Sequence, residues 1–209
     1  MPNTPDARGR ILNAAIKSFA EKSFAGSRID DIAKAANVPK SLIYYHFKSK
    51  DNILEVLIQE LLSEFKELLA IAKNDNHDDK PKTMKYKLQE HYSGFIKKNV
   101  DLIRILLIES LKKDNEIPLI FKIVEELVNG DSKNMKDDAS YDLNERLIAE
   151  FFTSLVPIYS FFCFQEKWCN YFEINENDLK QIFLNVYEQT HGAYHKNHDE
   201  EVFNEREDY

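Results

Sequence analysis

Glycine and proline are scarce in this chain, with 5 and 6 copies among 209 residues. Tight turns between strands depend on both residues, so their scarcity argues against an all-β fold. Leu, Ile, Lys, Glu and Ala are abundant, and these residues favour helices. Hydrophobic residues make up 43% of the chain, which is enough for a sizeable core. The composition therefore predicts an all-α fold.

The sequence also lacks a disulfide framework and a long apolar run. Its two cysteines, Cys163 and Cys169, are six apart, which places them on different faces of a helix and favours inert buried thiols over a redox pair. We find no run of about 18 apolar residues and expect no membrane span. The start of the chain, MPNTPDARGR, has no apolar signal segment. These features favour a reduced, cytoplasmic protein.

The motifs of the common enzyme classes are missing as well. The sequence contains no glycine-rich phosphate loop, no G-x-S-x-G motif and no paired catalytic constellation. His195 and His198 have an H-x-x-H spacing, but two ligands in a loose tail are too few for zinc, which takes three or four. We therefore expect neither an enzyme nor a cofactor nor a metal site.

Charge is distributed unevenly along the chain. Residues 1–50 hold nine Lys or Arg and four Asp or Glu, a balance of +5 in a chain of net charge −8, so residues 51–209 carry −13. A basic end on an acidic body indicates that the N-terminal part alone meets a polyanion, although plain surface charge would give a similar balance.

Apolar side chains at helical spacing predict four helices in the N-terminal part, over residues 8–22, 28–36, 39–45 and about 50–72. Ser27, followed three residues later by Asp30, is typical of a helix-capping pair. Asn37 tolerates the left-handed backbone that ends a helix, and Pro39 suits the first turn of the next one. Two short helices joined by such a corner form a helix-turn-helix, whose second helix fits the DNA major groove.

Side chains of the second helix of this motif divide into two sets. Ile43 and Phe47 are four apart and are expected to face inward, whereas Lys40 can donate to guanine O6 or N7. Ser41 and Tyr45 can reach base edges, and Leu42 can contact a thymine methyl group. Tyr44, His46 and Lys50 can donate to phosphate oxygens, and Arg28 is equally a phosphate contact or plain surface charge. The predicted DNA-binding residues are Arg28, Lys40, Ser41, Leu42, Tyr44, Tyr45, His46 and Lys50.

At residues 10–57, RILNAAIKSFAEKSFAGSRIDDIAKAANVPKSLIYYHFKSKDNILEVL, the sequence resembles the DNA-binding domain of the TetR/AcrR family of bacterial transcriptional regulators. The segment IYYHFKSKDNI carries the resemblance most specifically. It implies an all-helical homodimer with a ligand-binding C-terminal domain, which leaves its operator when ligand binds. Asn37 stands where the family usually has glycine, and Pro39 and Leu42 stand where small polar residues are common, so the operator sequence cannot be taken from a relative.

Beyond residue 72 the sequence predicts a larger helical domain. Amphipathic patterns indicate helices over residues 83–98, 100–113, 116–129, 143–172 and 176–191, with Pro157 expected to kink the fourth of these. Polar loops separate them at 73–82 and 129–142. The predicted domains are a helix-turn-helix domain at 1–50, an effector-binding and dimerisation domain at 51–194, and a charged tail at 195–209 that we expect to be disordered.

The aromatic segment 151–172 fits three interpretations: core, the lining of an effector cavity, or half of a four-helix dimer interface with 176–191. We favour core and interface for its later part. Glu109 and Glu150 could face a cationic ligand, although paired carboxylates are more usual. The residues predicted to line an effector pocket are Phe95, Leu106, Glu109, Phe121, Phe152 and Tyr159.

The sequence thus predicts a ligand-responsive regulator, a homodimeric repressor that reads a near-palindromic operator on double-stranded DNA through residues 39–46 and is released by a small apolar effector. An activator remains an alternative. A helical protein–protein adaptor is another, and it would explain the acidic body but not the first 50 residues.

Overall fold

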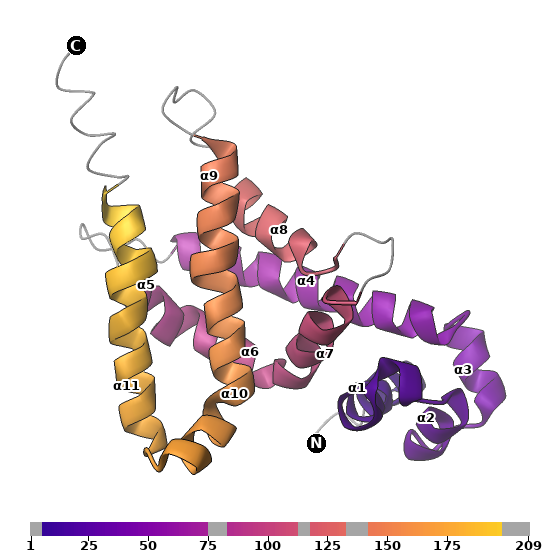
Figure 1. The fold of residues 1–209 in the computed structure, drawn as a ribbon. Helices are drawn as coiled ribbons and strands as arrows, with labels where there is room; N and C mark the ends of the chain where they lie inside the picture. The colour runs from indigo at the N-terminus through magenta and orange to yellow at the C-terminus, as the bar shows by residue number, and fades with distance from the viewer. Residues whose placement is uncertain (1–5, 75–82, 113–117, 133–141, 198–209) are drawn as a thin grey trace. The chain divides into compact units, whose positions relative to one another are not determined.

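A computed structural model describes residues 6–74, 83–112, 118–132 and 142–197 (Figure 1). Every regular element within these ranges is helical, which confirms the predicted all-α class. The chain divides into two compact units. The first contains the chain up to Glu64 together with Asp101–Ile120, and the second contains Phe65–Val100 together with the chain from Phe121 onward.

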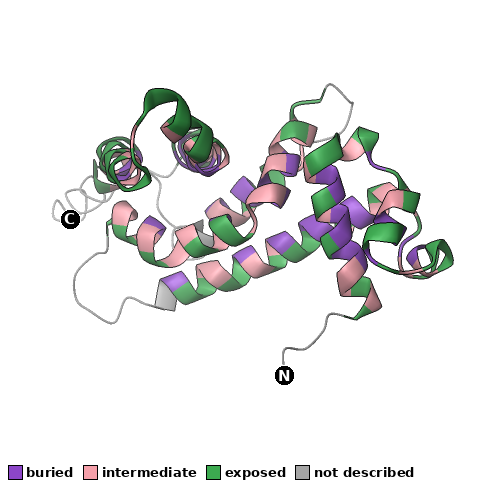
Figure 2. Ribbon diagram, turned by 90° about the horizontal axis from the view of Figure 1, so that it is seen from below, coloured by how far each residue is buried: buried purple, intermediate pink, exposed green. Residues whose placement is uncertain are grey.

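The first unit is built around three N-terminal helices. Its helices are α1 (Ala7–Gly26), α2 (Ile29–Ala35), α3 (Lys40–His46), the first part of α4 (Lys50–Asn74) and most of α7 (Val100–Ser110). Phe19, Ile32, Ile43 and Phe47 are at most 2% exposed and fill the space between α1, α2 and α3. Figure 2 shows the inner faces of these helices as buried and their outer faces as exposed. The inward positions predicted for Ile43 and Phe47 are therefore confirmed.

The corner between α2 and α3 has the predicted geometry. Asn37 has φ 53°, in the left-handed region, and the N–H of Val38 donates to the carbonyl oxygen of Ala33 at 3.0 Å. Such a bond satisfies a carbonyl that the end of the helix would leave without a partner. Pro39 then precedes the first residue of α3. The chain thus turns within four residues from α2 to α3.

The predicted capping role of Ser27 is wrong. Arg28, not Ser27, precedes α2, and Arg28 makes no side-chain capping bond. The buried hydroxyl of Ser27 instead shares its one hydrogen between the carbonyl oxygens of Ser18 and Ser23, both at 2.8 Å, and accepts from the Ser18 hydroxyl at 2.9 Å. The oxygen that would accept from an N–H at the start of α2 is thus bound to α1.

The second unit is also helical, and several of its helices contain a wide π-helical turn. Its elements are α5 (Met84–Lys87), η1 (Leu88–Tyr92), α6 (Ser93–Lys98), α8 (Phe121–Ser132), α9 (Leu143–Ile148), η2 (Ala149–Leu155), α10 (Val156–Phe172), α11 (Glu176–Tyr187), η3 (Glu188–Gly192) and a last helical stretch at 193–197. Elements α9, η2 and α10 form one continuous helix, and α11 runs beside it (Figure 1). The π-helical turn η2 ends two residues before Pro157, which has no N–H to bond to the preceding turn.

The prediction of no membrane span and the predicted start of the tail both concern this part of the chain. The continuous helix Leu143–Phe172 is long and apolar enough to cross a membrane, by length and composition alone, and 39% of its most apolar window is buried within the protein. The tail was expected to begin at His195, but the helix continues through 193–197. His198 and the remainder of the predicted tail lie outside the described residues.

Candidate nucleic-acid interface

Helix α3 presents a continuous exposed surface. Tyr45 is 81% exposed and Tyr44 is 52% exposed, although both are large aromatic residues. Lys40 and Ser41, one helical turn earlier, are exposed as well. Because residues four apart share a helix face, the pairs Lys40–Tyr44 and Ser41–Tyr45 form one surface. That surface combines hydrogen-bond donors with aromatic rings and lies opposite the buried Ile43.

Lys40 is tied to helix α2 by an ion pair. Its ammonium lies 2.8 Å from the Oδ1 atom of Asp30. The hydrogen bond from Lys40 to Asp30 raises the pKa of Lys40 above its ordinary value, with the charge of Asp30 adding to the effect. Both side chains are well exposed, so the pair can exchange Asp30 for another acceptor at little cost. Lys40 is therefore held in position while remaining available to a ligand.

Lys50 has a structural role. Its ammonium donates to the carbonyl oxygens of Phe24 at 2.7 Å and Ser27 at 3.1 Å, and it lies 4.5 Å from the centre of the Phe24 ring. A cation at the carbonyl end of a helix is favourable, because it meets the negative end of the helix dipole. Lys50 thus joins the start of α4 to the end of α1. Its predicted contact with DNA stays a prediction.

The remaining predicted DNA-binding residues lie on or beside the same surface. Arg28 is exposed, immediately before α2. Leu42 and His46 are half-buried, and the ring of His46 packs edge-on against Tyr45 at 5.1 Å. The structure therefore places His46 where it supports a neighbouring side chain as well as facing solvent.

The six predicted effector-pocket residues are divided between the two units. Leu106 and Glu109 belong to the first unit, whereas Phe95, Phe121, Phe152 and Tyr159 belong to the second. The carboxylate of Glu109 is paired with Lys112 at 2.6 Å. The six side chains range from Leu106, fully buried, to Phe152, 64% exposed. Their role as effector contacts stays a prediction.

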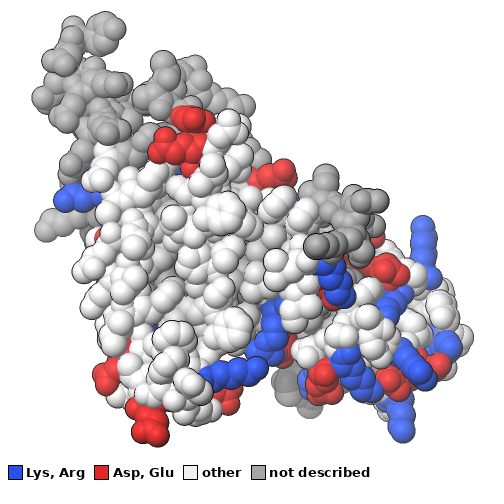
Figure 3. Space-filling model, in the orientation of Figure 1, with Lys and Arg blue, Asp and Glu red and all other residues white. Residues whose placement is uncertain are grey.

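An apolar groove lies instead along α10 and α11. It has a volume of about 800 Å³. The side chains that line it are Pro157, Ser160, Phe161, Phe164, Gln165, Lys167, Trp168, Tyr171, Phe172, Leu179, Ile182, Phe183 and Val186. Figure 3 shows this face almost free of charged residues. Phe164, Trp168 and Ile182 are each about half exposed, so the two helices leave a wide apolar surface uncovered.

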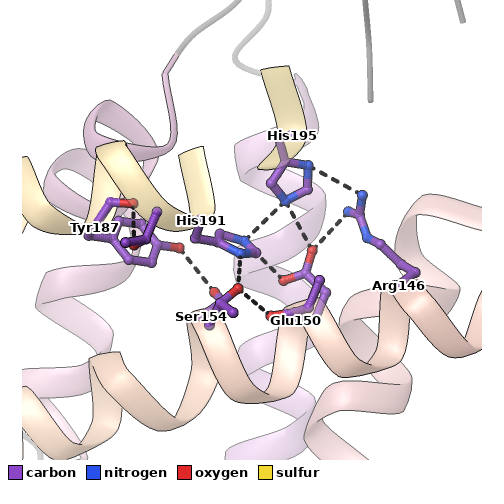
Figure 4. A network of polar contacts seen from close by, with 9 residues as sticks. Arg146, Glu150, Ser154, Tyr187, His191 and His195 are labelled. Carbon is purple, nitrogen blue, oxygen red and sulfur yellow. Dashed lines mark hydrogen bonds and ion pairs between the residues drawn. The ribbon is translucent and has the colours of Figure 1, made fainter. Parts of the chain in front are cut away.

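The second unit also contains a buried polar cluster, made of Arg146, Glu150, His191 and His195 (Figure 4). The guanidinium of Arg146 lies 2.9 Å from Oε1 of Glu150, and the two side chains are only 7% and 6% exposed. The Nε2 atom of His195 lies 3.2 Å from Glu150 Oε1, and that of His191 lies 3.4 Å from Glu150 Oε2. We call these four residues the His–Glu cluster.

The pKa values within the His–Glu cluster follow from burial and from these contacts. Burial alone would raise the pKa of the Glu150 carboxyl, but its contacts with His191 and His195 and the charge of Arg146 outweigh burial and hold that pKa well below its usual range. Burial lowers the pKa of His195, and Arg146 adds to this effect against the opposing effect of Glu150. Glu150 is thus ionised and His195 neutral at neutral pH.

The sequence analysis missed the His–Glu cluster. It paired His195 with His198, whereas the structure pairs His195 with His191, whose Nε2 atom lies 3.0 Å from its own. The available signal was the four-residue spacing of these histidines, which places both on one helix face. Glu150 was singled out as a carboxylate for a cationic ligand, and the cation beside it in the structure is Arg146.

Comparison with known families points to one group of proteins. Residues 11–57 match the family described as "Bacterial regulatory proteins, tetR family". The chain is 33% identical over 72 residues to the biofilm operon icaADBC HTH-type negative transcriptional regulator IcaR of Staphylococcus epidermidis. That match covers 34% of this chain and 37% of the relative, so it spans well under half of the relative's length. The Staphylococcus aureus protein of the same description is 33% identical over 70 residues, which are 38% of its length.

Solved structures share the fold over most of the chain. A TetR-like transcriptional regulator from a Rhodococcus species has a TM-score of 0.58 and 17% identity, and the match covers 88% of this chain and 96% of that one. The transcriptional regulator FadR from Bacillus subtilis in complex with stearoyl-CoA has a TM-score of 0.54 and 20% identity, with 86% and 96% covered. At these identities the likeness concerns the fold alone, and it extends beyond the N-terminal helices to the second unit.

Proposed function

This chain belongs to the TetR family of transcriptional regulators, and from that membership we propose that it is a homodimeric repressor that binds an operator through α3 and leaves it when a small apolar effector binds. Membership in a family of regulators excludes the enzyme class considered from the sequence. Because a bacterial repressor binds chromosomal DNA, we expect this protein to be located in the cytoplasm.

The observation that carries the DNA-binding proposal is the exposed surface of α3. Two large aromatic side chains, Tyr44 and Tyr45, are exposed to solvent beside Lys40. Burial would be energetically favourable for both rings, so their exposure suggests a binding role. A phenol can donate to phosphate, and its ring can pack against sugar or base. The buried Ile43 and Phe47 fix α3 on α1 and α2, so this surface is held rigidly for a ligand.

Within this proposal the predicted DNA-binding residues have different roles. Lys40 exchanges Asp30 for a base edge, with guanine as the preferred partner. Tyr44 and His46 donate to phosphates, and Arg28 adds a charge at the side of α3. Lys50 acts chiefly by fixing the helices, since its ammonium already binds backbone carbonyls.

The apolar groove on α10 and α11 supports the proposal that two chains form a dimer. Side chains such as Trp168 and Ile182 are about half exposed in the single chain, and a second copy packed on the same helices would cover them. The pairing then makes a four-helix contact from two helices of each subunit. In such a dimer two copies of α3 enter successive major grooves, roughly 34–36 Å apart.

Release by an effector requires that the effector bind the non-operator conformation more tightly. The aromatic residues of the second unit, including the edge-to-face contact of Phe121 and Phe151 at 5.4 Å, favour an apolar effector. The solved FadR structure holds stearoyl-CoA, which is an example of an acyl ligand in a protein of this fold. Helix α4 begins in the first unit and continues into the second, so it is the element expected to move.

The decisive experiment is a footprint of the purified protein on the DNA flanking its own gene, at two salt concentrations. A protected near-palindrome is expected, with affinity that falls steeply as salt rises. Tyr44→Ala should abolish the protection, whereas Tyr86→Ala, which removes an exposed tyrosine from the second unit, should preserve it. Equal protection by wild type and Tyr44→Ala would contradict the role of α3. Absence of any selected sequence in a genome-wide binding selection would favour the adaptor instead.

A further inference from the structure

We propose that Glu150, His191 and His195 form a binding site for one divalent transition-metal ion of the Zn²⁺ class in the second unit. The proposal goes beyond the repressor function and does not depend on it. It rests on the distances between the three side chains, on the hydrogen bonds that orient them and on the lack of hydrogens among the atoms that face one another.

The distances are close to those of a tetrahedral site, and a small rotation of the Glu150 carboxylate would bring one oxygen near both histidines. Two ligands bonded to zinc at 2.0–2.1 Å lie about 3.3 Å apart when the geometry is tetrahedral. The two Nε2 atoms lie 3.0 Å apart, and each also lies close to one oxygen of Glu150: that of His195 is 3.2 Å from Oε1 and that of His191 is 3.4 Å from Oε2. Ligand atoms of all three residues lie within 4.8 Å of one another. Two imidazoles and one carboxylate are a typical zinc ligand set that leaves a fourth position for water.

The hydrogen bonds around His191 orient it as a metal ligand. The hydroxyl of Thr153 donates its one hydrogen to the carbonyl oxygen of Ala149 at 2.7 Å. It must therefore accept from Nδ1 of His191, which lies 2.9 Å away. In the neutral ring, the lone pair is then on Nε2 and points at Glu150. The ring of Tyr187 stacks on His191 at 5.4 Å, and the Tyr187 hydroxyl is hydrogen-bonded to Ser154, which fixes the stack.

When both rings are neutral and no metal ion is bound, the facing atoms have too few hydrogens. Arg146 can only donate, so its contact at 3.3 Å makes Nδ1 of His195 an acceptor and places the His195 proton on Nε2. This single hydrogen serves both Glu150 Oε1 and His191 Nε2. His191 Nε2 and Glu150 Oε2 then face each other at 3.4 Å as two acceptors. A cation in place of the His195 proton would satisfy all three side chains.

Arg146 competes with the metal ion. It pairs with Glu150, and its contact with His195 holds the proton on the nitrogen that would bind metal. When metal binds, that proton leaves Nε2 and the neutral ring carries its hydrogen on Nδ1, where it meets the Arg146 donor. Arg146 must then move away, so removing it should tighten metal binding.

The backbone at the site is unusual as well. Glu150 lies on the π-helical turn η2 and His191 on the π-helical turn η3. Such turns are rare and occur frequently at functional sites. Here two of them contribute facing side chains to one buried position, and His195 follows η3 by one helical turn.

The test uses the full-length protein, without an affinity tag and stripped of metal by a chelator. Zn²⁺ affinity is measured by competition with a chromogenic chelator, and coordination by the visible absorption of bound Co²⁺. One Zn²⁺ per chain and a tetrahedral Co²⁺ spectrum are expected. Glu150→Gln, His191→Gln and His195→Gln should each lose on the order of 100-fold in Zn²⁺ affinity or more, whereas His91→Gln, a half-buried histidine outside the cluster, should leave it unchanged.

Two further variants keep the test informative if a ligand substitution unfolds the chain. Thr153→Val removes the hydroxyl that orients His191 and should weaken Zn²⁺ binding about 10–100-fold. Arg146→Gln should strengthen it, because the amide oxygen can accept from Nδ1 of His195. Failure of the wild type to bind one equivalent, or equal affinity in wild type and His195→Gln, would overturn the metal site. A weaker site in Arg146→Gln would overturn the competition with Arg146. Since no DNA is present, neither result depends on operator binding.

Discussion

The surface of α3 and the His–Glu cluster differ in how the chain assembles them. The α3 surface comes from one stretch of the sequence, and its side chains are exposed and individually replaceable. The cluster joins Arg146 and Glu150 to His191 and His195, more than 40 positions later, in a buried position. Substitutions in the α3 surface should therefore change binding and leave folding intact, whereas substitutions in the cluster should change folding first.

The largest effect is expected for Glu150→Gln in metal-free protein. It leaves the Arg146 charge buried without its carboxylate, which typically costs about 3–5 kcal/mol of unfolding free energy. Urea denaturation followed by circular dichroism measures this loss. The double variant Arg146→Met with Glu150→Leu removes both charges and should lose much less. Equal losses in the single and double variants would show that the pair matters through its volume and not its charge.

Next in size is the effect of Ile182→Glu, which places a charge in the apolar groove of α10 and α11. If two copies pair there, the free-energy cost of burying that charge should keep them apart. Analytical ultracentrifugation should then show a monomer. Loss of the second half-site contact should then lower operator affinity by about 100-fold or more. Gln181→Glu, at a neighbouring exposed position outside the groove lining, is the control and should remain a dimer. A dimeric Ile182→Glu protein would exclude this face as the interface.

A smaller change is expected for Lys50→Met, which keeps the length of the side chain and removes the ammonium that binds the carbonyls of Phe24 and Ser27. We expect a loss of about 1–2 kcal/mol in unfolding free energy, because charged hydrogen bonds to backbone carbonyls are lost at a partly buried position. Thermal denaturation measures it, with Lys48→Met at an exposed neighbour as the matched control. If Lys50→Met were as stable as wild type and bound DNA weakly, Lys50 would be a phosphate contact after all.

The smallest change is expected for Lys40→Ala, which should leave stability intact and relax the preferred base at one operator position by about tenfold. A binding selection on randomised operators, run beside wild type, measures the preference. Tyr44→Ala is the contrast, since it should weaken binding to all sequences alike. Unchanged preference in Lys40→Ala would show that another side chain reads that base.

The two regions also show what the sequence could and could not predict. The corner at Asn37 and the inward Ile43 and Phe47 followed from local rules, because backbone preference and helical spacing act over a few residues. The predicted capping role of Ser27 was wrong, because its hydroxyl is bonded to Ser18 and Ser23 of α1. Local spacing does not reveal such a contact with another helix.

The His–Glu cluster could not be predicted from local sequence patterns, because it depends on packing between helices that are far apart in the sequence. Its formation depends on α11 lying beside α9 and α10, and on π-helical turns that shift the register of side chains after Ala149 and Glu188. The spacing of His191 and His195 was visible, but their partner on another helix was not. Helical pattern alone also did not show that the six predicted effector residues are divided between the two units.

The contact of Lys50 with the end of α1 has a mechanical consequence. Helix α4 is an uninterrupted helix of 25 residues, and Lys50 is its first residue. The ammonium holds that first residue against the carbonyls of Phe24 and Ser27, just before α2. A bend at residues 47–49 would have to break these contacts. We therefore expect the first turn of α4 to move together with the end of α1 if the helix rotates.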